Sequence, residues 1–508
     1  IYDPHSTYMA PSTEEDFDIA MRLSLQGIGA LLTTEDGYVK VAGILPGGPA
    51  EMDGRLKEGD RIIAVAQEDE EPVDVIDMPL RKVVKMIRGE KGTTVFLTVI
   101  EADKGLGSVP GIIDIVRDEV KLKEQEAKSE IRTTRLPAEG ETAGAEGRIL
   151  LITLPSFYSD FEGKHEGSES YKSSTRDVKR LIEEAAAEQD VDGMVLDLRS
   201  NGGGSLDEAV ALAGLFFPSG PVVQVKHSTR PLKKRYDEDG ETVYDGPLVV
   251  LTNRLSASAS EIVAAAIQDY RRGVIVGESS THGKGTVQTV YDLKRGFRTS
   301  PLFRDRNPGA LKFTMAKFYR VNGGSTQKKG VEPDIVLPSF TDHMELGEAH
   351  LPHALPWDEI ESLDVERPVD VGPYLPLLKE RAAVRLGTLE QYRRLAEDIE
   401  AFGERRDRKR ISLNRQERLA RQEEEEKWSE RIRQYTSRRR DDEDDEGGEE
   451  QEPEKPDLAL EEAVRVLADL IQLQRGTELP DVPLTARKAP ALTADAPGAE
   501  PAAARTVP

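Results

Sequence analysis

The sequence predicts an α/β core that follows a small β-rich unit and precedes a charged helical region. Three observations lead to this fold class. Between about 110 and 340, near-continuous apolar strand-like runs alternate with helix-like runs, which is typical of helices packed against a sheet. Between about 20 and 104, short β-rich runs are separated by glycine-containing turns. After about 345 the sequence is highly charged and helix-prone.

Length and composition limit the possible functions. At 508 residues the chain is too long for a single core, so we expect two or three domains. The net charge of −25, from 94 acidic and 69 basic residues, argues against nucleic acid as the main partner and favours a protein or peptide. The chain has no cysteine, and its seven histidines form no pair with metal-ligand spacing, so no metal site is expected. Its apolar runs are too short to span a membrane.

The β-rich unit contains four candidate strands and one short helix. The strands are LSLQGIGALL, YVKVAGIL, RIIAVAQ and TVFLTVI, separated by the turns PGGPA and EGD. Four apolar residues of the candidate helix MPLRKVVKMI form one stripe at helical spacing: Leu80, Val83, Val84 and Ile87. This stripe can pack against the unit's own sheet or line a ligand site, and both interpretations stay open.

The α/β region follows a regular order. Its expected elements are RILLITL, a helix near 173–188, GMVLDLRS, a helix over 206–217, VVQV, PLVVLT, a helix from about 258, and VIVGE. A second β-rich stretch, LKFTMAKFYRV, and the segment GVEPDIVLP end the region. This alternation predicts helices against the faces of one sheet.

The charged region is expected to end in one amphipathic helix, because Leu460, Val464, Leu467 and Ile471 share a face. The acidic tract at 441–457 is expected to be a disordered loop. We therefore divide the chain into 1–19 (part of the core, or a linker), 20–104 (β-rich domain), 105–340 (α/β core), 341–475 (charged helical domain) and 476–508 (flexible Pro/Ala-rich tail).

Three serines mark the start of the helix near 258, in the run NRLSASASE. Ser256, Ser258 and Ser260 follow an apolar strand, and serine is a favoured helix N-cap. One of them can therefore be a cap and nothing more. A nucleophilic serine needs a base that removes its proton. No histidine or aspartate forms an obvious triad with these serines in the sequence.

A lysine 26 residues beyond Ser258 is a candidate base. Lys284 lies between two glycines, and serine–lysine pairs are a known variant of the serine–histidine arrangement. The lysine must be neutral to act, so its pKa has to fall from about 10.4 to about 7–8, which corresponds to roughly 4 kcal/mol and which burial can supply. Gln288 can orient the amine without adding charge. GKG alone is weak evidence, and the pattern of the phosphate-binding P-loop is not met.

Acyl transfer also needs donors for an oxyanion. The run SNGGGS follows the strand GMVLDLR and precedes a helix, so the amides of Gly202, Gly203 and Gly204 can face a ligand. The amide of Ala259, directly after Ser258, is the natural second donor. By itself, SNGGGS can equally be an ordinary strand-to-helix connection.

Taken together, these motifs closely resemble those of the tail-specific proteases, also called carboxy-terminal processing proteases. The matching runs are DPHSTYM (3–9), GIGALL (27–32), PGGPA (46–50), GD (59–60), LRSNGGG (198–204), SASASEI (256–262), GKGTVQ (283–288), KFYRVNGGSTQ (317–327) and GVEPDI (330–335). They follow the family's order over about residues 1–340, and the charged helical remainder resembles the long subgroup.

The resemblance implies a crotonase/ClpP-like protease core with a serine–lysine dyad. It implies that Ser258 is the nucleophile, Lys284 the general base and Gln288 its support. A glycine of the triple run, Gly203 or Gly204, would share the oxyanion hole with Ala259. Two departures are that the loop GESSTHGKG is one residue longer than the family pattern and that His282 replaces an aromatic residue. His282 leaves room for an imidazole base.

The resemblance also implies that the β-rich unit is an inserted PDZ domain. Such domains add a peptide strand to a sheet edge and receive its terminal carboxylate on loop amides. Gly27, Ile28 and Gly29 would form the carboxylate loop, and the stripe of Leu80, Val83, Val84 and Ile87 would line the pocket from the helix. Ordinary core packing is the alternative for that stripe, and it must hold for some of its members.

The implied function is an ATP-independent serine endopeptidase that captures the apolar C-termini of unfolded proteins or loose tails. No ATP site is evident, and no cofactor is expected. The family further implies a periplasmic location, a role in cell-envelope protein turnover and a lipoprotein adaptor with helical repeats. Its longest members carry a further N-terminal domain, which we expect to lie outside this chain because the chain opens directly on DPHSTYM.

Two other classes of function stay open. A non-catalytic scaffold would combine PDZ-like peptide binding with an inactive hydrolase core, although the presence of Ser258, Lys284 and the triple glycine argues against it. An acyl-CoA enzyme of the crotonase type uses similar glycine-rich oxyanion loops, but it would leave the PDZ-like unit and Lys284 unexplained.

Overall fold

The computed structural model describes most of the chain outside two C-terminal segments. The described residues are 3–105, 107–137, 145–168, 170–237, 240–294, 307–408, 410, 412–419, 421–422, 457–477 and 479. The expected acidic loop (441–457) lies outside them except for Asp457, and the expected tail (476–508) lies outside them except for residues 476, 477 and 479.

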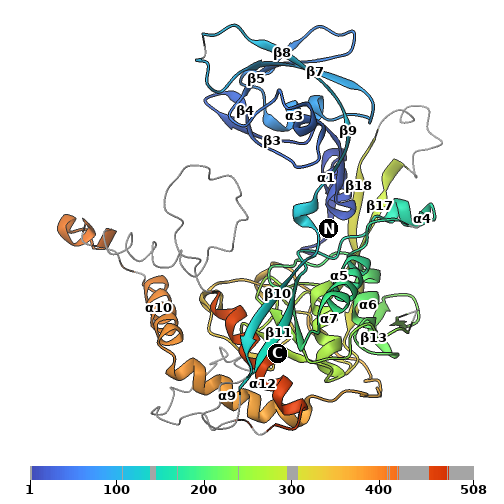
Figure 1. The fold of residues 1–508 in the computed structure, drawn as a ribbon, viewed down its shortest axis with the longest axis vertical. Helices are drawn as coiled ribbons and strands as arrows, with labels where there is room; N and C mark the ends of the chain where they lie inside the picture. Colours follow the sequence, from blue (N-terminus) through green and yellow to red (C-terminus); the bar gives the residue numbers. More distant parts are fainter. Residues whose placement is uncertain are drawn as a thin grey trace, which may run out of the picture.

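The β-rich unit forms one sheet with two short helices. The strand order is β3 (Ala30–Glu35), β4 (Tyr38–Ile44), β5 (Arg61–Gln67), β7 (Thr94–Ile100) and β8 (Gly111–Val116), with β6 (Val73–Asp74) paired to β5. Helices α2 (Pro49–Asp53) and α3 (Leu80–Ile87) complete the unit. The unit stands at one end of the molecule (Figure 1), and its last strand lies beyond the boundary at 104 expected from the sequence.

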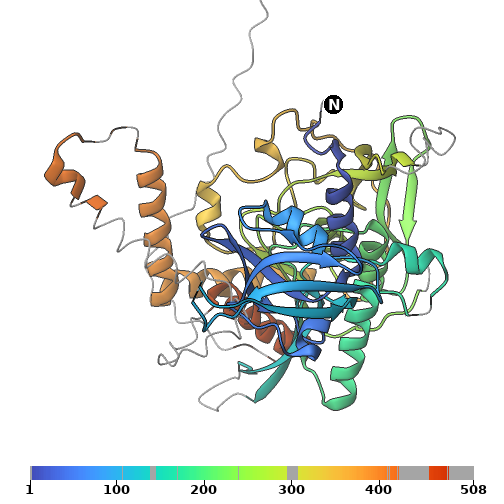
Figure 2. The same ribbon diagram turned by 90° about the horizontal axis from the view of Figure 1, so that it is seen from above.

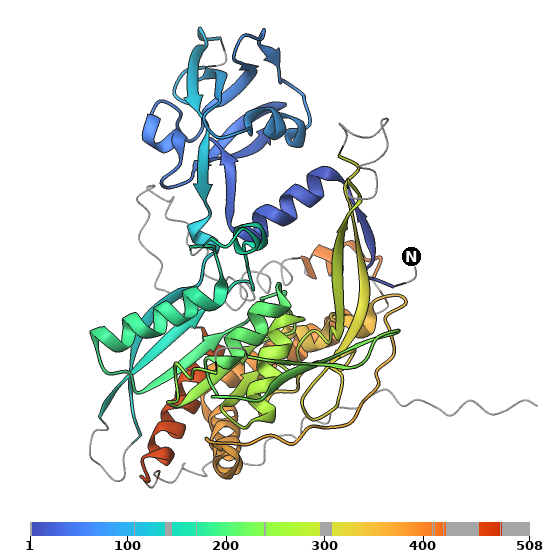
Figure 3. The ribbon, with the colours of Figure 1, turned by 90° about the vertical axis from the view of Figure 1, so that its right-hand side faces the viewer.

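Two segments join this unit to the rest of the protein. Helix α1 (Pro11–Arg22) leads into β2 (Ser24–Gly27), which pairs with β9 (Asp118–Lys121) on the return path. Before α1, strand β1 (Thr7–Met9) already belongs to a sheet of the core. The β-rich unit is therefore an insertion between core strands, connected by the neck visible in Figure 3.

The core is built on a six-stranded sheet with β-order 10-11-12-15-16-19. Its strands are β10 (Lys128–Arg135), β11 (Glu146–Thr153), β12 (Gly193–Asp197), β15 (Leu248–Thr252), β16 (Val274–Gly277) and β19 (Ile335–Val336). All neighbours are parallel except β10 and β11. Every residue of β12 and β15 is buried, as expected for central strands covered on both faces.

Helices cover the two faces of this sheet differently. Helices α5 (Ser174–Glu188), α6 (Leu206–Gly214) and α7 (Ala259–Asp269) share one apolar cluster with Met194 and Leu196. The alternate residues Val195 and Val249 belong to a second cluster with α9 (Leu375–Thr388) and α12 (Leu458–Gln474). This alternation follows from the two-residue repeat of a strand. The sheet is thus closed on its second face by C-terminal helices that lie far away in the sequence.

A second, antiparallel sheet lies beside the helices of the first face. Its strands are β1, β13 (Pro221–His227), β14 (Lys233–Tyr236), β17 (Thr286–Asp292) and β18 (Ala310–Tyr319). The run VVQV was expected to be a strand of the main core sheet. It forms β13, which belongs to this second sheet instead. Its continuous apolar character is the same for a buried strand of either sheet, so the pattern could not separate them.

The C-terminal region is helical where it is described. Helix α10 (Glu390–Arg406) projects away from α9, whereas α12 lies against the core (Figures 1 and 2). In the predicted amphipathic stripe of α12, Leu460, Leu467 and Ile471 are buried and Val464 is half-buried. Short 3-10 turns, among them Phe340–His343 and Glu348–His350, connect the core to this region. Among the helices of the described ranges, none combines the length and apolar character of a membrane span.

Candidate active site

The serine run forms the turn between β15 and α7. Ser256 and Ser260 are fully buried, and their hydroxyls donate to the carbonyls of Leu198 (2.8 Å) and Asn201 (2.9 Å). Ser258 stands at the N-cap of α7 with φ 56° and ψ −106°, a backbone conformation that residues other than glycine rarely adopt. The two outer serines thus fasten the turn to the residues after β12, while the strained middle serine lies between these anchors.

The same anchors bring the glycine run against Ser258. Asn201 uses its side chain to fix the loop, because Nδ2 donates to the Leu154 carbonyl (2.9 Å) and Oδ1 accepts the Gly203 N–H (2.9 Å). A Cβ added to Gly203 would lie 2.9 Å from the Ser258 Cβ, so only glycine permits this approach. The structure thus brings together two motifs that lie more than 50 residues apart, and it engages the Gly203 amide within the loop.

Gly204 is held by a different neighbour. It has φ 148°, and an added Cβ would lie 2.3 Å from the Phe157 carbonyl oxygen. That carbonyl accepts the N–H of Ser205 (2.8 Å), and the Phe157 N–H donates to the Gly203 carbonyl (3.0 Å). Gly204, which lies two residues before α6, is therefore held against the backbone of Phe157.

Lys284 lies between β16 and β17 in a largely buried position. Burial lowers the pKa of its ammonium group to about 8, and the positive charge of Lys312 acts in the same direction. The carboxylates of Glu348 and Glu261 act in the opposite direction. The nearby His282 also has a lowered pKa because of burial, and its Nδ1 has no hydrogen-bond partner among the described residues.

A buried carboxylate, Glu261, ties the serine turn to the lysine loop. One of its oxygens, Oε2, accepts the backbone N–H groups of both Ser258 (2.7 Å) and Lys284 (3.0 Å). Its other oxygen accepts the N–H of Gly283 (2.6 Å) and the hydroxyl of Thr281 (2.7 Å). Because both nitrogens lie within 3.0 Å of one oxygen, the backbones of Ser258 and Lys284 are immediate neighbours. Burial raises the pKa of Glu261 to about 7, against the effect of these hydrogen bonds.

The backbones of Ser258 and Lys284 are neighbours, but their side chains are not paired. Between described residues, no hydrogen bond joins the Ser258 hydroxyl to the Lys284 amine. The amide of Gln288, on β17, donates to the hydroxyls of Thr286 (2.9 Å) and Thr314 (3.3 Å) rather than to the lysine. This arrangement is common before substrate binds, when catalytic hydrogen bonds are often not yet formed.

The side chain of Gln327 also contacts the loop that carries Lys284. The Gln327 side chain accepts the N–H of Gly285 (2.8 Å) and donates to the buried Glu348 carboxylate (2.8 Å). Glu348 also contacts Nε2 of His5 (2.8 Å), so the N-terminal segment takes part in this cluster. In the described residues, no group of three His, Cys, Asp or Glu side chains could hold a metal ion.

Sequence reasoning missed Glu261, Asn201, Gln327 and Glu348. A signal existed for Glu261, because Ser258-x-x-Glu261 has the spacing of a helix capping box. For Gln327 and Glu348 the sequence offered no comparable signal, since their contacts depend on loops from distant parts of the chain.

In the β-rich unit, the predicted peptide site falls at an open sheet edge. Gly27, Ile28 and Gly29 directly precede β3, which in the described part of the chain pairs with β4 alone and also contacts α3. The carbonyls of Ile28 and Gly29 accept the N–H groups of Ala50 and Leu45, both at 2.8 Å, which fixes the loop.

The members of the helix stripe divide into two kinds. Val83 and Ile87 are buried with Ile28 in the unit's core, so the packing interpretation holds for them. Leu80 and Val84 are partly exposed on α3. Only these two retain surface that a ligand beside β3 can contact.

Three family models match separate parts of the chain. Residues 17–100 match the PDZ domain, 148–337 match peptidase family S41, and 341–472 match the C-terminal domain of tail-specific protease. The chain belongs to the tail-specific proteases of peptidase family S41. The match to the S41 model includes Ser258, Lys284 and the triple glycine.

The similar proteins include curated relatives and solved structures. The tail-specific protease of Haemophilus influenzae is 38% identical over 482 residues, which are 92% of this chain and 64% of that protein. The carboxy-terminal processing protease CtpA of Bacillus subtilis is 31% identical, over 66% of this chain and 62% of that protein. The chain therefore spans somewhat less than two thirds of the length of these two relatives.

Two solved structures are also similar. A photosystem II D1 C-terminal processing protease is 28% identical, with a TM-score of 0.35 over 70% of this chain and 84% of that chain. The PDZ domain of a carboxy-terminal protease from Vibrio cholerae, solved in complex with peptide, is 44% identical, with a TM-score of 0.19 over 20% of this chain and all of that chain.

Proposed function

We propose that this protein is an ATP-independent serine endopeptidase that cleaves polypeptides captured by their apolar C-termini. The observation that carries the proposal is the shared carboxylate oxygen of Glu261, which holds the backbones of Ser258 and Lys284 side by side. A strained serine at a helix N-terminus and a buried lysine with a pKa of about 8 are the nucleophile and base that acyl transfer requires.

In the proposed reaction, the neutral Lys284 amine takes the proton of the Ser258 hydroxyl as Oγ attacks the scissile carbonyl. The resulting ammonium then gives this proton to the departing amine, and water releases the acyl group by the reverse sequence. With a pKa of about 8, roughly one lysine in ten is neutral at pH 7, compared with fewer than one in a thousand at the ordinary value. Burial thus supplies most of the required shift.

We assign the oxyanion donors to Ala259 and Gly204. The Gly203 N–H is already donated to the Asn201 side chain, so the role of Gly203 is to let the loop approach Ser258. Gln288 would orient the lysine only after its amide leaves Thr286 and Thr314, and Lys284 must turn until its amine reaches the Ser258 hydroxyl.

We further infer that the PDZ domain selects the substrate. A peptide would add to the open edge of β3, with its terminal carboxylate on the loop Gly27–Ile28–Gly29 and its last apolar side chain beside Leu80 and Val84. By family resemblance, the proposal extends to a crotonase/ClpP-like core, a periplasmic location, turnover of cell-envelope proteins and a lipoprotein adaptor with helical repeats.

An unstructured peptide with an apolar C-terminus tests this function. We expect cleavage by the unmodified protein, complete loss of cleavage in both Ser258→Ala and Lys284→Ala, and unchanged peptide binding in all three. Binding without cleavage by the unmodified protein would instead establish the scaffold function. Full cleavage by Lys284→Ala would exclude the lysine as base and direct attention to His282.

A further inference from the structure

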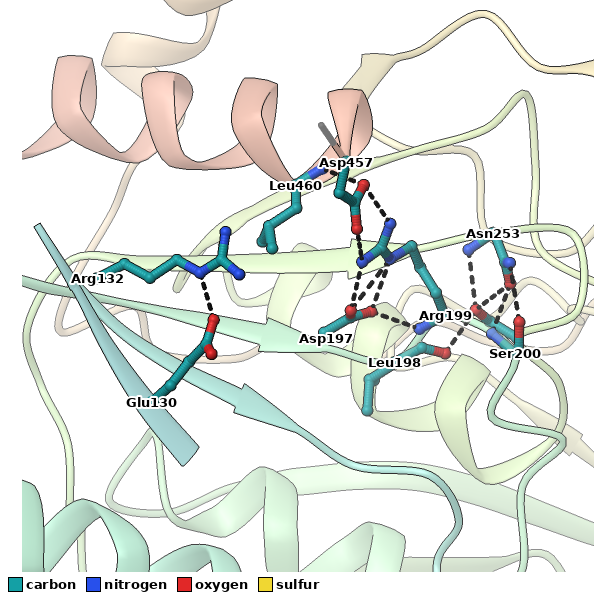
Figure 4. A network of polar contacts seen from close by, with 10 residues as sticks. Glu130, Arg132, Asp197, Leu198, Arg199, Ser200, Asn253, Asp457 and Leu460 are labelled. Atoms are coloured by element: carbon teal, nitrogen blue, oxygen red, sulfur yellow. Dashed lines mark hydrogen bonds and ion pairs between the residues drawn. The ribbon is translucent and has the colours of Figure 1, made fainter. Parts of the chain in front are cut away.

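The loop at 198–204, which carries the proposed oxyanion donor Gly204 and is called the oxyanion loop below, contacts the C-terminal domain through Arg199. Arg199, two residues after β12, lies between the carboxylates of Asp197 and Asp457 (Figure 4). Its Nη1 and Nη2 donate to the two oxygens of Asp457 at 2.8 and 2.7 Å, and Nε and Nη2 donate to Asp197. Such a two-pronged contact fixes the orientation of both partners as well as their distance.

Asp457 also begins helix α12. Its side chain caps the helix by accepting the N–H of Leu460 (3.0 Å). The hydrogen bonds and the positive charge of Arg199 hold the pKa of Asp457 below its usual value, although the Asp457 side chain keeps part of its surface exposed. The Asp457 carboxylate thus both caps helix α12 and forms an ion pair with Arg199 in the loop after β12.

An ion pair at each end of α12 fastens it along β12. At its C-terminal end, Arg475 pairs with Asp192, the residue before β12 begins. At its N-terminal end, Asp457 pairs with Arg199, just past the point where β12 ends. Between these ends, Leu467 and Ile471 pack so closely on Gly193 that an added Cβ would lie 2.9 Å from Ile471. The two ion pairs are similar in kind, but only the Asp457–Arg199 pair adjoins the candidate active site.

The residues next to Arg199 determine the shape of that site. The backbone carbonyl of Leu198 accepts a hydrogen bond from the Ser256 hydroxyl, and the Ser200 N–H donates to the Asn253 side chain (2.8 Å). Ser200 has a positive φ of 58°, so the turn is held in a conformation that serine rarely adopts. Asn201 then anchors Gly203 and the serine turn, as described above. A shift of the Arg199 backbone is therefore transmitted both to the oxyanion glycines and to Ser258.

We propose that Asp457 of the C-terminal domain is a positioning residue for the oxyanion loop, acting through its two-pronged contact with Arg199. This inference rests on the proposed peptidase function and adds a role for the C-terminal domain in the chemical step. Without the Asp457 charge, Arg199 still donates to Asp197 at the end of its own strand but loses its ion pair with helix α12. The turn at 198–204 then loses its bidentate contact with the C-terminal domain, and the donors move away from the developing oxyanion.

The substitution Asp457→Asn separates alignment from helix capping. Asparagine is as good an N-cap as aspartate, so α12 keeps its first turn, while one carboxylate oxygen facing Arg199 becomes an NH2 group that cannot accept. Arg475→Gln is the matched control, because it breaks the ion pair at the far end of the same helix. Both variants are made in the full chain and compared by kcat, KM, thermal unfolding and binding of the apolar-ended peptide.

We expect Asp457→Asn to lower kcat at least about tenfold with KM changed less than about twofold, since removal of a whole oxyanion donor lowers kcat about 10²–10³-fold. Arg475→Gln should keep kcat within about twofold, although its melting temperature falls as far as that of Asp457→Asn. Asp457→Glu, which retains the charge, should recover part of kcat.

Two results overturn the inference while leaving the peptidase function intact. One is an Asp457→Asn variant with the kcat of the unmodified protein. The other is an equal loss of kcat in Asp457→Asn and Arg475→Gln, which would mean that α12 contributes general stability only. If the unmodified protein itself cleaves nothing, the proposed function fails first, so the two failures are distinguishable.

Discussion

The substitution Glu261→Gln changes the carboxylate that joins Ser258 to Lys284 without changing its size. Glutamine replaces one acceptor oxygen by an NH2 group that can only donate. In one orientation this NH2 faces the backbone N–H groups of Ser258 and Lys284, and in the other it faces Gly283 and Thr281. The second orientation is better, because it leaves only one backbone N–H, that of Gly283, without an acceptor.

The expected loss of stability follows from that count. A buried donor without a partner lowers the free energy of unfolding by about 1–3 kcal/mol. For a core of this size, each kcal/mol corresponds to about 2–4 °C in melting temperature. Displacement of Gly283 also moves Lys284, and a misplacement of about 1 Å in a catalytic group lowers the rate roughly 100-fold. We expect kcat to fall by about one to two orders of magnitude, with KM nearly unchanged.

The matched control is Glu208→Gln in helix α6. The Glu208 carboxylate is equally buried, but it accepts three of its hydrogen bonds from the hydroxyls of Ser159, Ser173 and Ser174. A hydroxyl can rotate and accept a bond from the new NH2 group, so this variant should lose less stability. Calorimetry and peptide cleavage assays check both variants. A Glu261→Gln variant with unaltered kcat and melting temperature would refute the reasoning.

Three further predictions concern the lysine and the glycines. Cleavage, measured as kcat/KM, should rise with pH with a midpoint near 8, because Lys284 loses its proton there. Lys312→Gln should move that midpoint upward, because it removes a neighbouring positive charge. An unchanged midpoint in Lys312→Gln would contradict this effect of Lys312. Lys284→Met should abolish cleavage yet raise the melting temperature at pH 7, where the buried lysine is charged in both the folded and the unfolded protein. The gain in melting temperature should shrink as pH rises from about 8 towards 10.5. In that range the unfolded unmodified protein binds more protons than the folded one, so the unmodified protein becomes more stable. A lower melting temperature at pH 7 is the opposing result. Gly204→Ala should lose both activity and stability, since its Cβ would meet the Phe157 carbonyl at 2.3 Å; normal thermal unfolding would show that the loop can move aside.

Local sequence patterns predicted much of the site. The apolar runs of β12 and β15 and the serine-rich start of α7 identified where strands give way to helices, and the outer serines Ser256 and Ser260 have the packing role left open for them. The pattern could not separate Gly203 from Gly204, because the difference lies in a hydrogen bond to the Asn201 side chain. The stripe of α3 was expected to line a pocket with some members in the core, and the pattern could not tell which; Val83 and Ile87 are the buried ones.

Long-range contacts were beyond the reach of the sequence. Arg199 and Asp457 are 258 residues apart, and nothing in a local pattern indicates that helix α12 begins beside the loop that follows β12. The same holds for the assignment of β13 to the second sheet, because the apolar pattern of a strand does not indicate which strand it pairs with. Such contacts are decided by packing of the whole chain.

The distance between the Ser258 hydroxyl oxygen and the Lys284 amine nitrogen in a crystal structure of the peptide complex tests the central claim most directly. The account predicts a separation within hydrogen-bond reach, about 2.6–3.2 Å, with Glu261 still accepting both backbone N–H groups. A lysine amine that stays out of reach while the His282 ring contacts the Ser258 hydroxyl would contradict it.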